Sequence, residues 1–471
     1  MPKLHNLSAA ELSRAFARGE LSPVEATESA LSRIEAWEPN INAMFIVHHD
    51  KARADAKASE ARWRGKHPLS ALDGVPITIK ENIYTKGDAA PIGTKANQEA
   101  PSPDTDAPPS ARVREAGCVI LGKTTMPDYG MLSSGLSSMH GITRNPWRLD
   151  RNTSGSSSGA AAAAVAGYGP LHLGTDIGGS VRLPATHCGI FALKPTLGRV
   201  PVNPPFIGRV TGPMTRTVTD SALLMNELSK PDARDFMSVA YQPIDYVAAL
   251  AGNLDMWARK SRIAFLPDMR CGMPVAPEVR ASAVASVRAL EKLGAVVEEI
   301  PSFLTAELLD GVCRFFEARS HNDIAQLALE RRARVLPFIT DWCTHRAQSF
   351  SGRDVMASVN ALFALREAAI RATTRYDFVI SPTSPILPYE AEHACPGNDP
   401  RNALPHIAFT VPYNMSEQPA ASINWGTSAD GLPIGVQIIG RRFDDVGVLR
   451  LARVLEELRP MQRDWPNVET A

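Results

Sequence analysis

A repeated order of helix, glycine and strand constrains the fold of this chain more than any other feature. Residues 262–266 form a short apolar segment, 277–293 carry apolar residues at helical spacing, and 295–297 resume an apolar segment just after Gly294. The same order of helix, glycine and strand occurs at 111–121. Strands that alternate with helices in this way are typical of parallel pairs covered by helices. The sequence therefore predicts an α/β fold.

Helix signals extend this prediction to both ends of the chain. Two opening helices are expected, because Ser8-Ala9-Ala10-Glu11 and Ser22-Pro23-Val24-Glu25 both have the spacing of a capping box. A mostly helical stretch is predicted from Leu308 to Thr374, in which one helix face is expected to contain the residues at helical spacing, Val355, Val359, Leu362, Arg366 and Ile370. Asp445 is expected to cap a last helix that runs to Leu458. Because no repeat or low-complexity linker interrupts the chain, we expect one domain over residues 1–471.

Composition narrows the function classes. The chain has 471 residues, of which 44% are hydrophobic and 21% charged, as in a globular protein. Its 50 acidic and 50 basic residues cancel, which argues against nucleic acid as a partner and favours small, weakly charged substrates. No apolar stretch is long enough for a membrane span or a signal peptide.

The cysteine and histidine patterns predict the location of the protein and the absence of a metal site. The six cysteines show no Cys-x-x-Cys spacing, which favours a reduced, cytoplasmic location. The eleven histidines contain no metal-binding motif, so no metal site is predicted. We expect His140, His172 and His187 to form structural hydrogen bonds.

Ser180 and Lys80 suit acyl transfer. Ser180 follows Gly178 and Gly179, and a serine beside glycines offers a nucleophile together with backbone amides that can reach a developing oxyanion. Lys80 ends an apolar strand and shares a face with Thr78, opposite Ile77 and its apolar neighbours. If that face is the catalytic interior, desolvation lowers the pKa of Lys80 and makes it a usable base. Taken alone, Lys80 would more often be a strand-end lysine that reaches water, and Ser180 a turn serine.

Two motif matches are rejected on their context. Residues 117–124 match the P-loop pattern G-x-x-x-x-G-K-[ST], but a helix precedes the first glycine and the intervening residues form a strand. Residues 155–159 match the nucleophile elbow G-x-S-x-G, but the preceding residues 145–153 are polar and predicted to be a loop. The alanine-rich residues 160–166 predict a helix just after these serines, so Ser157 and Ser158 are expected to be cap residues.

The sequence resembles the amidase signature family, serine hydrolases that use a Ser-cisSer-Lys triad. The resemblance covers nearly the whole chain and rests on residues 73–82, 155–159, 174–185, 193–200, 376–383 and 430–440. It implies a single domain with a central mixed β-sheet covered by helices on both faces. A variable, mostly helical cover at about 305–375 would lie over the substrate entrance. The resemblance implies no cofactor.

The resemblance also assigns roles to residues. Ser180 would be the nucleophile, Ser156 a proton relay that follows a cis peptide bond, and Lys80 the neutral base. The expected oxyanion hole consists of the amides of Ile177, Gly178, Gly179 and Ser180. Asp176 and Arg182 are expected to support this loop, and Met131 and Thr175 to contact the substrate. Ser154, Ser158 and Ala160 depart from the commonest family pattern, which leaves the triad unchanged.

The implied activity is hydrolysis of the C–N bond of a small carboxylic amide, aryl amide, ester or carbamate through an acyl-enzyme. Two alternatives stay open: a glutaminase subunit of the amidotransferase A type that works in a complex, and a catalytically silent binding protein on the same fold. No segment between Leu308 and Thr374 is recognisable as one that binds glutamine, which favours a freestanding enzyme for small uncharged substrates. A homodimer is compatible with the sequence. Specificity is expected to reside in 126–139, 203–209 and 308–374.

Overall fold

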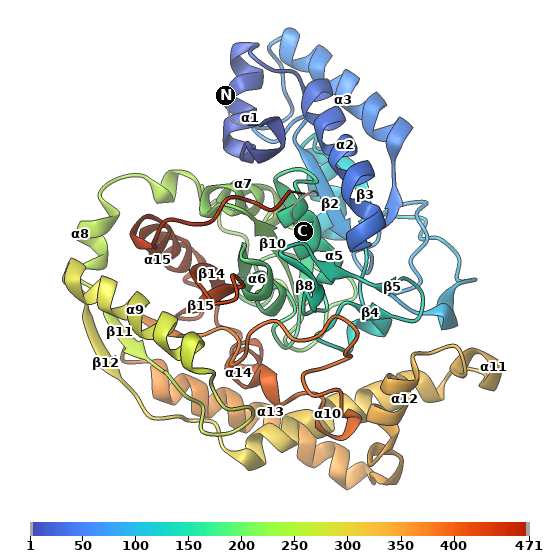
Figure 1. The fold of residues 1–471 in the computed structure, drawn as a ribbon, viewed down its shortest axis with the longest axis vertical. Helices are drawn as coiled ribbons and strands as arrows, with labels where there is room; N and C mark the ends of the chain where they lie inside the picture. The colour runs from blue at the N-terminus through green and yellow to red at the C-terminus, as the bar shows by residue number, and fades with distance from the viewer. Residues whose placement is uncertain (1–2, 468–471) are drawn as a thin grey trace.

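The computed structural model describes residues 3–467. An eleven-stranded mixed sheet runs through it in the order β1-β3-β2-β8-β10-β9-β14-β15-β13-β11-β12 (Figure 1). Its strands are β1 (Met44–Val47), β2 (Pro76–Lys80), β3 (Val119–Thr124), β8 (Leu171–Asp176), β9 (Phe191–Lys194), β10 (Val210–Thr215), β11 (Arg262–Phe265), β12 (Val296–Glu299), β13 (Phe378–Pro382), β14 (Ala420–Thr427) and β15 (Pro433–Gly440). The predicted α/β fold with a mixed central sheet is confirmed.

Strand direction changes along the sheet. β2 is parallel to β3 and β8, and β11 is parallel to β12 and β13. The strands between these two groups pair antiparallel, as does β1 at the edge. Four short strands form two hairpins outside the main sheet: β4 (Leu136–Ser137) with β5 (Gly141–Ile142), and β6 (Arg144–Asn145) with β7 (Arg148–Asn152).

The helices have the following bounds: α1 (Ala9–Arg18), α2 (Pro23–Ile41), α3 (His49–Arg64), α4 (Pro108–Glu115), α5 (Ser158–Ala166), α6 (Arg182–Cys188), α7 (Val218–Leu228), α8 (Leu254–Ala258), α9 (Pro277–Leu293), α10 (Ala306–Ala325), α11 (Leu329–Arg332), α12 (Pro337–Thr344), α13 (Gly352–Thr373), α14 (Val411–Met415) and α15 (Asp445–Leu458). Among the described residues, no helix combines the length and apolar character of a membrane span.

Helices cover both faces of the sheet, because successive side chains of a strand point to opposite sides. In β9, Phe191 and Leu193 pack into the apolar cluster that contains α7, α9 and α15, whereas Ala192 packs into the cluster of α5 and α6. At one end of the sheet α2 and α3 pack together, and at the other α10, α12 and α13 form a separate helical layer (Figure 1). This layer is the stretch predicted to be helical.

The predicted helix starts are confirmed where capping chemistry is strong. Ser8 and Ser22 each accept a hydrogen bond from the amide of the glutamate three residues later, in complete capping boxes. The helix α9 has the predicted bounds and ends at Gly294, whose φ of 113° is open to glycine. These signals are local, so tertiary contacts do not alter them.

Three local predictions are wrong. In α13 the buried face consists of Ser358, Leu362, Leu365, Ala369 and Thr373, while Val355 and Ile370 are 36% and 38% exposed. The cause is the close approach of α10, where a Cβ on Gly311 would lie 2.3 Å from that of Ala361. The last helix is capped by Asp444. Its neighbour Asp445 is buried and accepts hydrogen bonds from Thr196.

The third error concerns residues 145–153, for which the sequence predicts a loop. They contain the strand β7, which pairs with β6 in a small hairpin. This hairpin is not part of the central sheet, so it does not form the buried strand that a nucleophile elbow requires.

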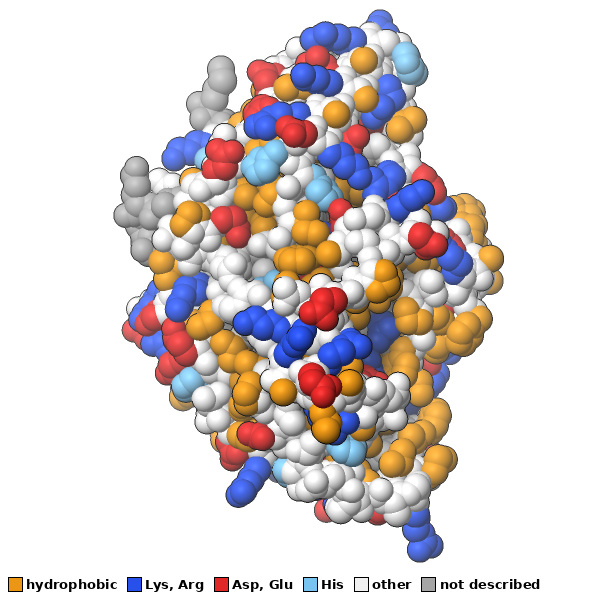
Figure 2. All heavy atoms as spheres, turned by 90° about the vertical axis from the view of Figure 1, so that its right-hand side faces the viewer, with side chains coloured by type: hydrophobic (Ala, Val, Ile, Leu, Met, Phe, Trp, Pro, Cys, Tyr) orange, Lys and Arg blue, Asp and Glu red, His pale blue; other side chains and the backbone are white. Residues whose placement is uncertain are grey.

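Figure 2 shows acidic and basic side chains interspersed over one face of the molecule, as the balanced charge predicts.

Candidate active site

Lys80 lies at the end of β2 and is fully buried. Ile77 and Ile79 point into the large apolar cluster on one face of the sheet, so Lys80 points to the other face, as predicted. There its Nζ atom lies 2.8 Å from Ser156 Oγ, 3.1 Å from Ser157 Oγ and 3.0 Å from Thr175 Oγ1. The lysine is thus surrounded by hydroxyl groups.

This environment favours the neutral amine. Burial lowers the pKa of Lys80 from 10.5 to about 7, although the charges of Asp176 and Glu81 act in the opposite direction. A neutral amine has two N–H donors and one lone pair, which matches the three hydroxyl partners. At neutral pH a large fraction of Lys80 can therefore accept a proton.

Ser156 and Ser157 come from the turn that leads into α5, and the peptide bond between Gly155 and Ser156 is cis. The helix α5 packs closely on the sheet because its residues are small. A Cβ on Gly159 would lie 2.3 Å from the carbonyl oxygen of Ala43. This close packing fixes the serines beside the end of β2.

Ser157 does not act as the predicted helix cap. It is the residue that precedes α5, but its side chain makes no capping hydrogen bond. Its hydroxyl instead accepts from Lys80 and donates to the carbonyl oxygen of Thr175, at 3.2 Å. Ser157 therefore holds the lysine and the end of β8 together.

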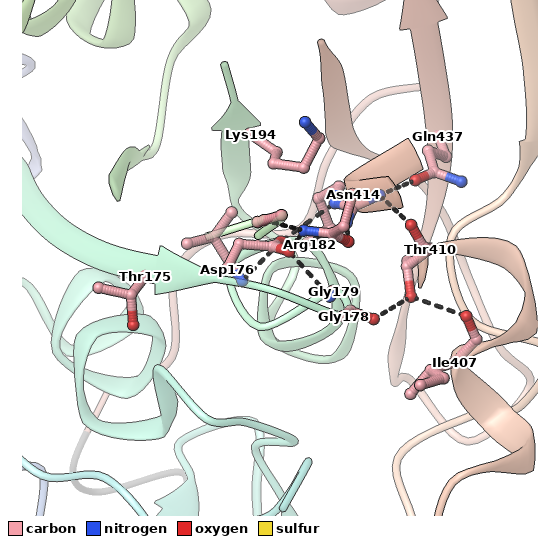
Figure 3. A network of polar contacts seen from close by, with 12 residues as sticks. Thr175, Asp176, Gly178, Gly179, Arg182, Lys194, Ile407, Thr410, Asn414 and Gln437 are labelled. Carbon is pink, nitrogen blue, oxygen red and sulfur yellow. Dashed lines mark hydrogen bonds and ion pairs between the residues drawn. The ribbon is translucent and has the colours of Figure 1, made fainter. Parts of the chain in front are cut away.

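Ser180 lies in the loop between β8 and α6, and this loop is organised around Asp176 (Figure 3). The Asp176 carboxylate accepts hydrogen bonds from the amides of Gly179, at 2.8 Å, and Val181, at 3.1 Å. It also accepts from Arg182 and Asn414. Burial alone would raise its pKa, but the charge and hydrogen bonds of Arg182 hold the pKa of Asp176 well below its usual range.

Arg182 ties this loop to distant segments. Besides Asp176, its guanidinium donates to the Thr410 carbonyl oxygen at 3.0 Å, to Gln437 Oε1 at 2.7 Å and to Asn414 Oδ1 at 2.6 Å (Figure 3). Thr410 Oγ1 in turn donates to the carbonyl oxygen of Gly178, at 2.6 Å. The serine loop is therefore held on both sides by buried polar contacts.

The amides of this loop divide into two groups. Gly179 N–H points to Asp176, so it is already satisfied and its expected place in an oxyanion hole is not supported. Within residues 3–467, the amides of Ile177, Gly178 and Ser180 have no hydrogen-bond acceptor. Position 179 requires glycine for the conformation of the loop. Its φ is +128°, and a Cβ there would lie 2.4 Å from Thr410 Oγ1.

Ser156 and Ser180 line one pocket. The remaining lining residues come from several segments: Asn82, Tyr129, Gly130, Met131, Leu132, Ser133, Thr175, Asp176, Ile177, Gly178, Arg209, Phe316, Arg319, Ser320, Trp342, Leu404 and Ile407. The set includes both Met131 and Thr175. It also draws on α10 and α12, so the helical layer forms one wall of the pocket.

Sequence reasoning missed several members of this site. Asn82 donates to Thr175 Oγ1 at 3.2 Å and lies two residues after Lys80, within the motif 73–82. Thr410 and Asn414 approach the serine loop from more than two hundred residues away. Only the motif position of Asn82 offered a sequence signal.

The histidines and the P-loop match take no part in the pocket. His140 pairs with the buried Glu81, and His172 contacts Thr78 Oγ1 at 2.8 Å. The lysine of the P-loop match, Lys123, is buried and donates to the carbonyl oxygen of Ile83. In the part of the chain that the structure describes, no cluster of three or more histidine, cysteine or acidic side chains could hold a metal ion.

A comparison with models of protein families finds one family that covers most of the fold and all of the motifs. The family model described as Amidase matches residues 25–449. The chain belongs to the amidase signature family. The resemblance inferred from the motifs is thereby confirmed.

Curated relatives of the chain span nearly its whole length. It is 36% identical to the A-type subunit of the glutamyl-tRNA(Gln) amidotransferase of Symbiobacterium thermophilum, over 95% of each chain. It is 32% identical to an acylamidase of Rhodococcus erythropolis, over 97% of this chain and 96% of the relative. The two relatives have different activities, so sequence similarity alone does not choose between them.

Solved structures resemble the chain over nearly its whole length. A bacterial aryl acylamidase of the amidase signature family superposes with a TM-score of 0.87 at 28% identity, over 97% of this chain and 96% of the other. The 6-aminohexanoate cyclic dimer hydrolase superposes with a TM-score of 0.86 at 28% identity, over the whole of both chains. The architecture is therefore that of amidase signature enzymes.

Proposed function

We propose that the protein hydrolyses the C–N bond of a small carboxylic amide through an acyl-enzyme on Ser180. The observation that carries this proposal is the buried Lys80, whose Nζ atom lies 2.8 Å from Ser156 Oγ. A buried neutral amine beside a serine relay is a base that needs neither histidine nor metal. Esters and carbamates present the same carbonyl and are included in the substrate class.

In the proposed reaction, Ser180 Oγ attacks the carbonyl carbon. Its proton passes to Ser156 Oγ as the Ser156 proton passes to Lys80. The amides of Ile177, Gly178 and Ser180 stabilise the oxyanion, and loss of a single donor of this kind typically costs about 3–4 kcal/mol of transition-state stabilisation. Lys80, now protonated, returns the proton through Ser156 to the leaving nitrogen as the C–N bond breaks.

Water then attacks the acyl-enzyme by the same route in reverse. It gives a proton to the Ser156–Lys80 pair, which returns it to Ser180 Oγ as the carboxylic acid leaves. The side chains of Asp176 and Arg182 keep the loop in place and do not enter the reaction. No cofactor supplies a step in this scheme.

A glutaminase subunit of an amidotransferase is the second candidate, because relatives that span the whole chain carry that name. Both candidates use the same acyl-enzyme, so they differ in substrate and partner. Purified protein should be incubated alone with glutamine and with a panel of aliphatic, aryl and carbamate substrates, and the products resolved by mass spectrometry. Turnover of several amides without a partner supports the freestanding hydrolase. Turnover of glutamine alone, and only in the presence of partner subunits, supports the amidotransferase.

A further inference from the structure

Two arginines stand out in the serine pocket. Arg209 follows the loop 203–208 and Arg319 lies on α10, and both line the pocket that contains Ser156 and Ser180. Both also line a neighbouring cavity, whose walls include Tyr84 and Asp323. The overall charge of the chain is zero, so this local pair of cations is not visible in the composition.

The two guanidinium groups contact the same aromatic ring. The Cζ atoms of Arg209 and Arg319 lie over the ring of Phe206, at 5.5 Å and 4.4 Å from its centroid. Burial and the nearby charge of Arg319 lower the pKa of Arg209 to about 10. The side chain of Arg319 is 27% exposed. Two partly buried cations beside one ring repel each other, and a nearby anion offsets this repulsion.

The protein supplies little of that compensation. A guanidinium has five N–H donors. Arg209 donates to the Pro204 carbonyl oxygen at 3.2 Å and, within the described residues, forms no ion pair. Arg319 has one acidic neighbour, Asp323, at 3.9 Å from its Nε atom, which is long for a hydrogen bond.

Two other arginines of the interior, Arg182 and Arg216, have full sets of partners. Arg182 has four side-chain or carbonyl partners, including the carboxylate of Asp176. Arg216 donates to the carbonyl oxygens of His5, Ala164 and Val165. The unfilled donors of Arg209 and Arg319 face the serine pocket, where they suit an anion supplied by the substrate.

We propose that the substrate amide carries a carboxylate group, which Arg209 and Arg319 hold while Ser180 attacks the amide carbonyl. This inference rests on the proposed function and names its substrate class. Planar guanidinium groups match carboxylates in geometry and charge. It replaces the expectation of an uncharged substrate, which rested on the balanced charge of the chain and on the lack of a recognisable glutamine-binding segment. Glutamine, which carries both groups, belongs to the same class.

Two matched substrate series test the proposal. One compares monoamides of dicarboxylic acids, from succinamate to adipamate, with the corresponding neutral diamides. The other compares N-acyl amino acids with N-acyl amino alcohols, which places the carboxylate on the leaving group. We expect the charged member of at least one series to have a kcat/KM at least about tenfold higher, a ratio that corresponds to one charge-assisted contact. Preference for the neutral member in both series would overturn the proposal.

Variants assign the preference to the two arginines. Arg319→Gln and Arg209→Gln should each reduce the charged-to-neutral ratio of kcat/KM by about tenfold or more. Arg314→Gln is the matched control, because Arg314 lies on the same helix and pairs with Asp310 away from the pocket. It should retain the wild-type ratio. A preference that survives in both pocket variants would assign the carboxylate to other residues.

Calorimetry separates this proposal from the proposed hydrolysis. Glutarate should bind the wild-type protein more tightly than glutaramide, and this difference should disappear in Arg319→Gln. That result supports the anion site whether or not the protein hydrolyses amides. If Ser180 reacts with a fluorophosphonate probe and neutral amides are hydrolysed, but glutarate does not bind, then the anion site is wrong and the hydrolase stands.

Discussion

The amine of Lys80 and the hydroxyl of Ser156 lie 2.8 Å apart in the buried centre of the molecule. Two other hydroxyls, those of Ser157 and Thr175, complete the surroundings of the amine. The lysine is thus held by neutral groups, and burial favours its neutral form. The proposed proton transfer between Ser180 and Lys80 depends on this arrangement and on the loop that carries Ser180.

Activity should depend on the protonation of Lys80. Because burial lowers the pKa of Lys80 to about 7, the neutral fraction rises as the pH passes through about 7. The rate of acylation should therefore increase from acidic pH and reach a plateau in the alkaline range. A pH profile of kcat/KM measures this directly. A flat profile between about pH 6 and 9, or a limb near the ordinary lysine pKa of about 10.4, would contradict the assignment.

Lys80→Arg should be inactive, since a guanidinium keeps its proton at every accessible pH. Turnover and probe labelling should both fall by several orders of magnitude. A thermal melt is needed as a control, because the larger side chain must fit a fully buried site. A folded Lys80→Arg protein with substantial activity would remove lysine as the base.

Ser156→Ala and Ser157→Ala form a matched pair of adjacent substitutions. Loss of the Ser156 relay should reduce kcat by several orders of magnitude, since the proton path from Ser180 to Lys80 is broken. Loss of Ser157 removes one hydrogen-bond acceptor of Lys80 and should cost about tenfold, the effect of one hydrogen bond of about 1.4 kcal/mol. Single-turnover kinetics on both variants would check that Ser156→Ala loses more activity than Ser157→Ala. Equal losses would mean that the two serines share one role.

Asp176→Asn tests the support of the serine loop. The substitution leaves the buried Arg182 without its carboxylate, and breaking a buried ion pair in this way costs about 3–5 kcal/mol of unfolding free energy. Urea denaturation of the variant measures the loss. Glu20→Gln is a suitable control, because its pair with Arg18 lies on the surface and should contribute nothing measurable. A stability change as small as that of the control would show that Arg182 does not depend on Asp176.

Met131→Ala should alter selectivity without affecting the chemistry. Met131 lines the pocket from the segment 126–139, so its truncation enlarges the space beside Ser180. The ratio of kcat/KM for a bulky over a small acyl group should rise by about tenfold, the usual effect of one or two methylene groups. Met256→Ala, at a methionine that is 57% exposed on α8, is the control. An unchanged ratio would place specificity in other segments.

The sequence predicted the parts of this structure that depend on local chemistry. The capping boxes at Ser8 and Ser22 form as expected, and strand alternation placed Lys80 opposite Ile77 and Ile79. Motifs identified the family because they lie in short contiguous segments around Lys80, Ser156 and Ser180. Local signals of this kind survive folding unchanged.

Features set by distant contacts could not be predicted. The buried face of α13 depends on Gly311 of α10, whose missing side chain lets the two helices approach. Ser157 has the position of a helix cap, yet contact with Lys80 gives its hydroxyl a different partner. Arg209 and Arg319 meet at Phe206 only after the chain has folded. The net charge of zero therefore did not predict the two cations in the pocket.

The proposed mechanism depends above all on Ser180 as the nucleophile, and covalent labelling tests that role. The protein is reacted with a fluorophosphonate probe, and peptide mass spectrometry locates the adduct. We expect a single adduct on the peptide that contains Ser180, with no adduct and no amide turnover in Ser180→Ala. An adduct on Ser156 or Ser157 in the wild-type protein, or undiminished amide turnover by Ser180→Ala, would contradict the mechanism.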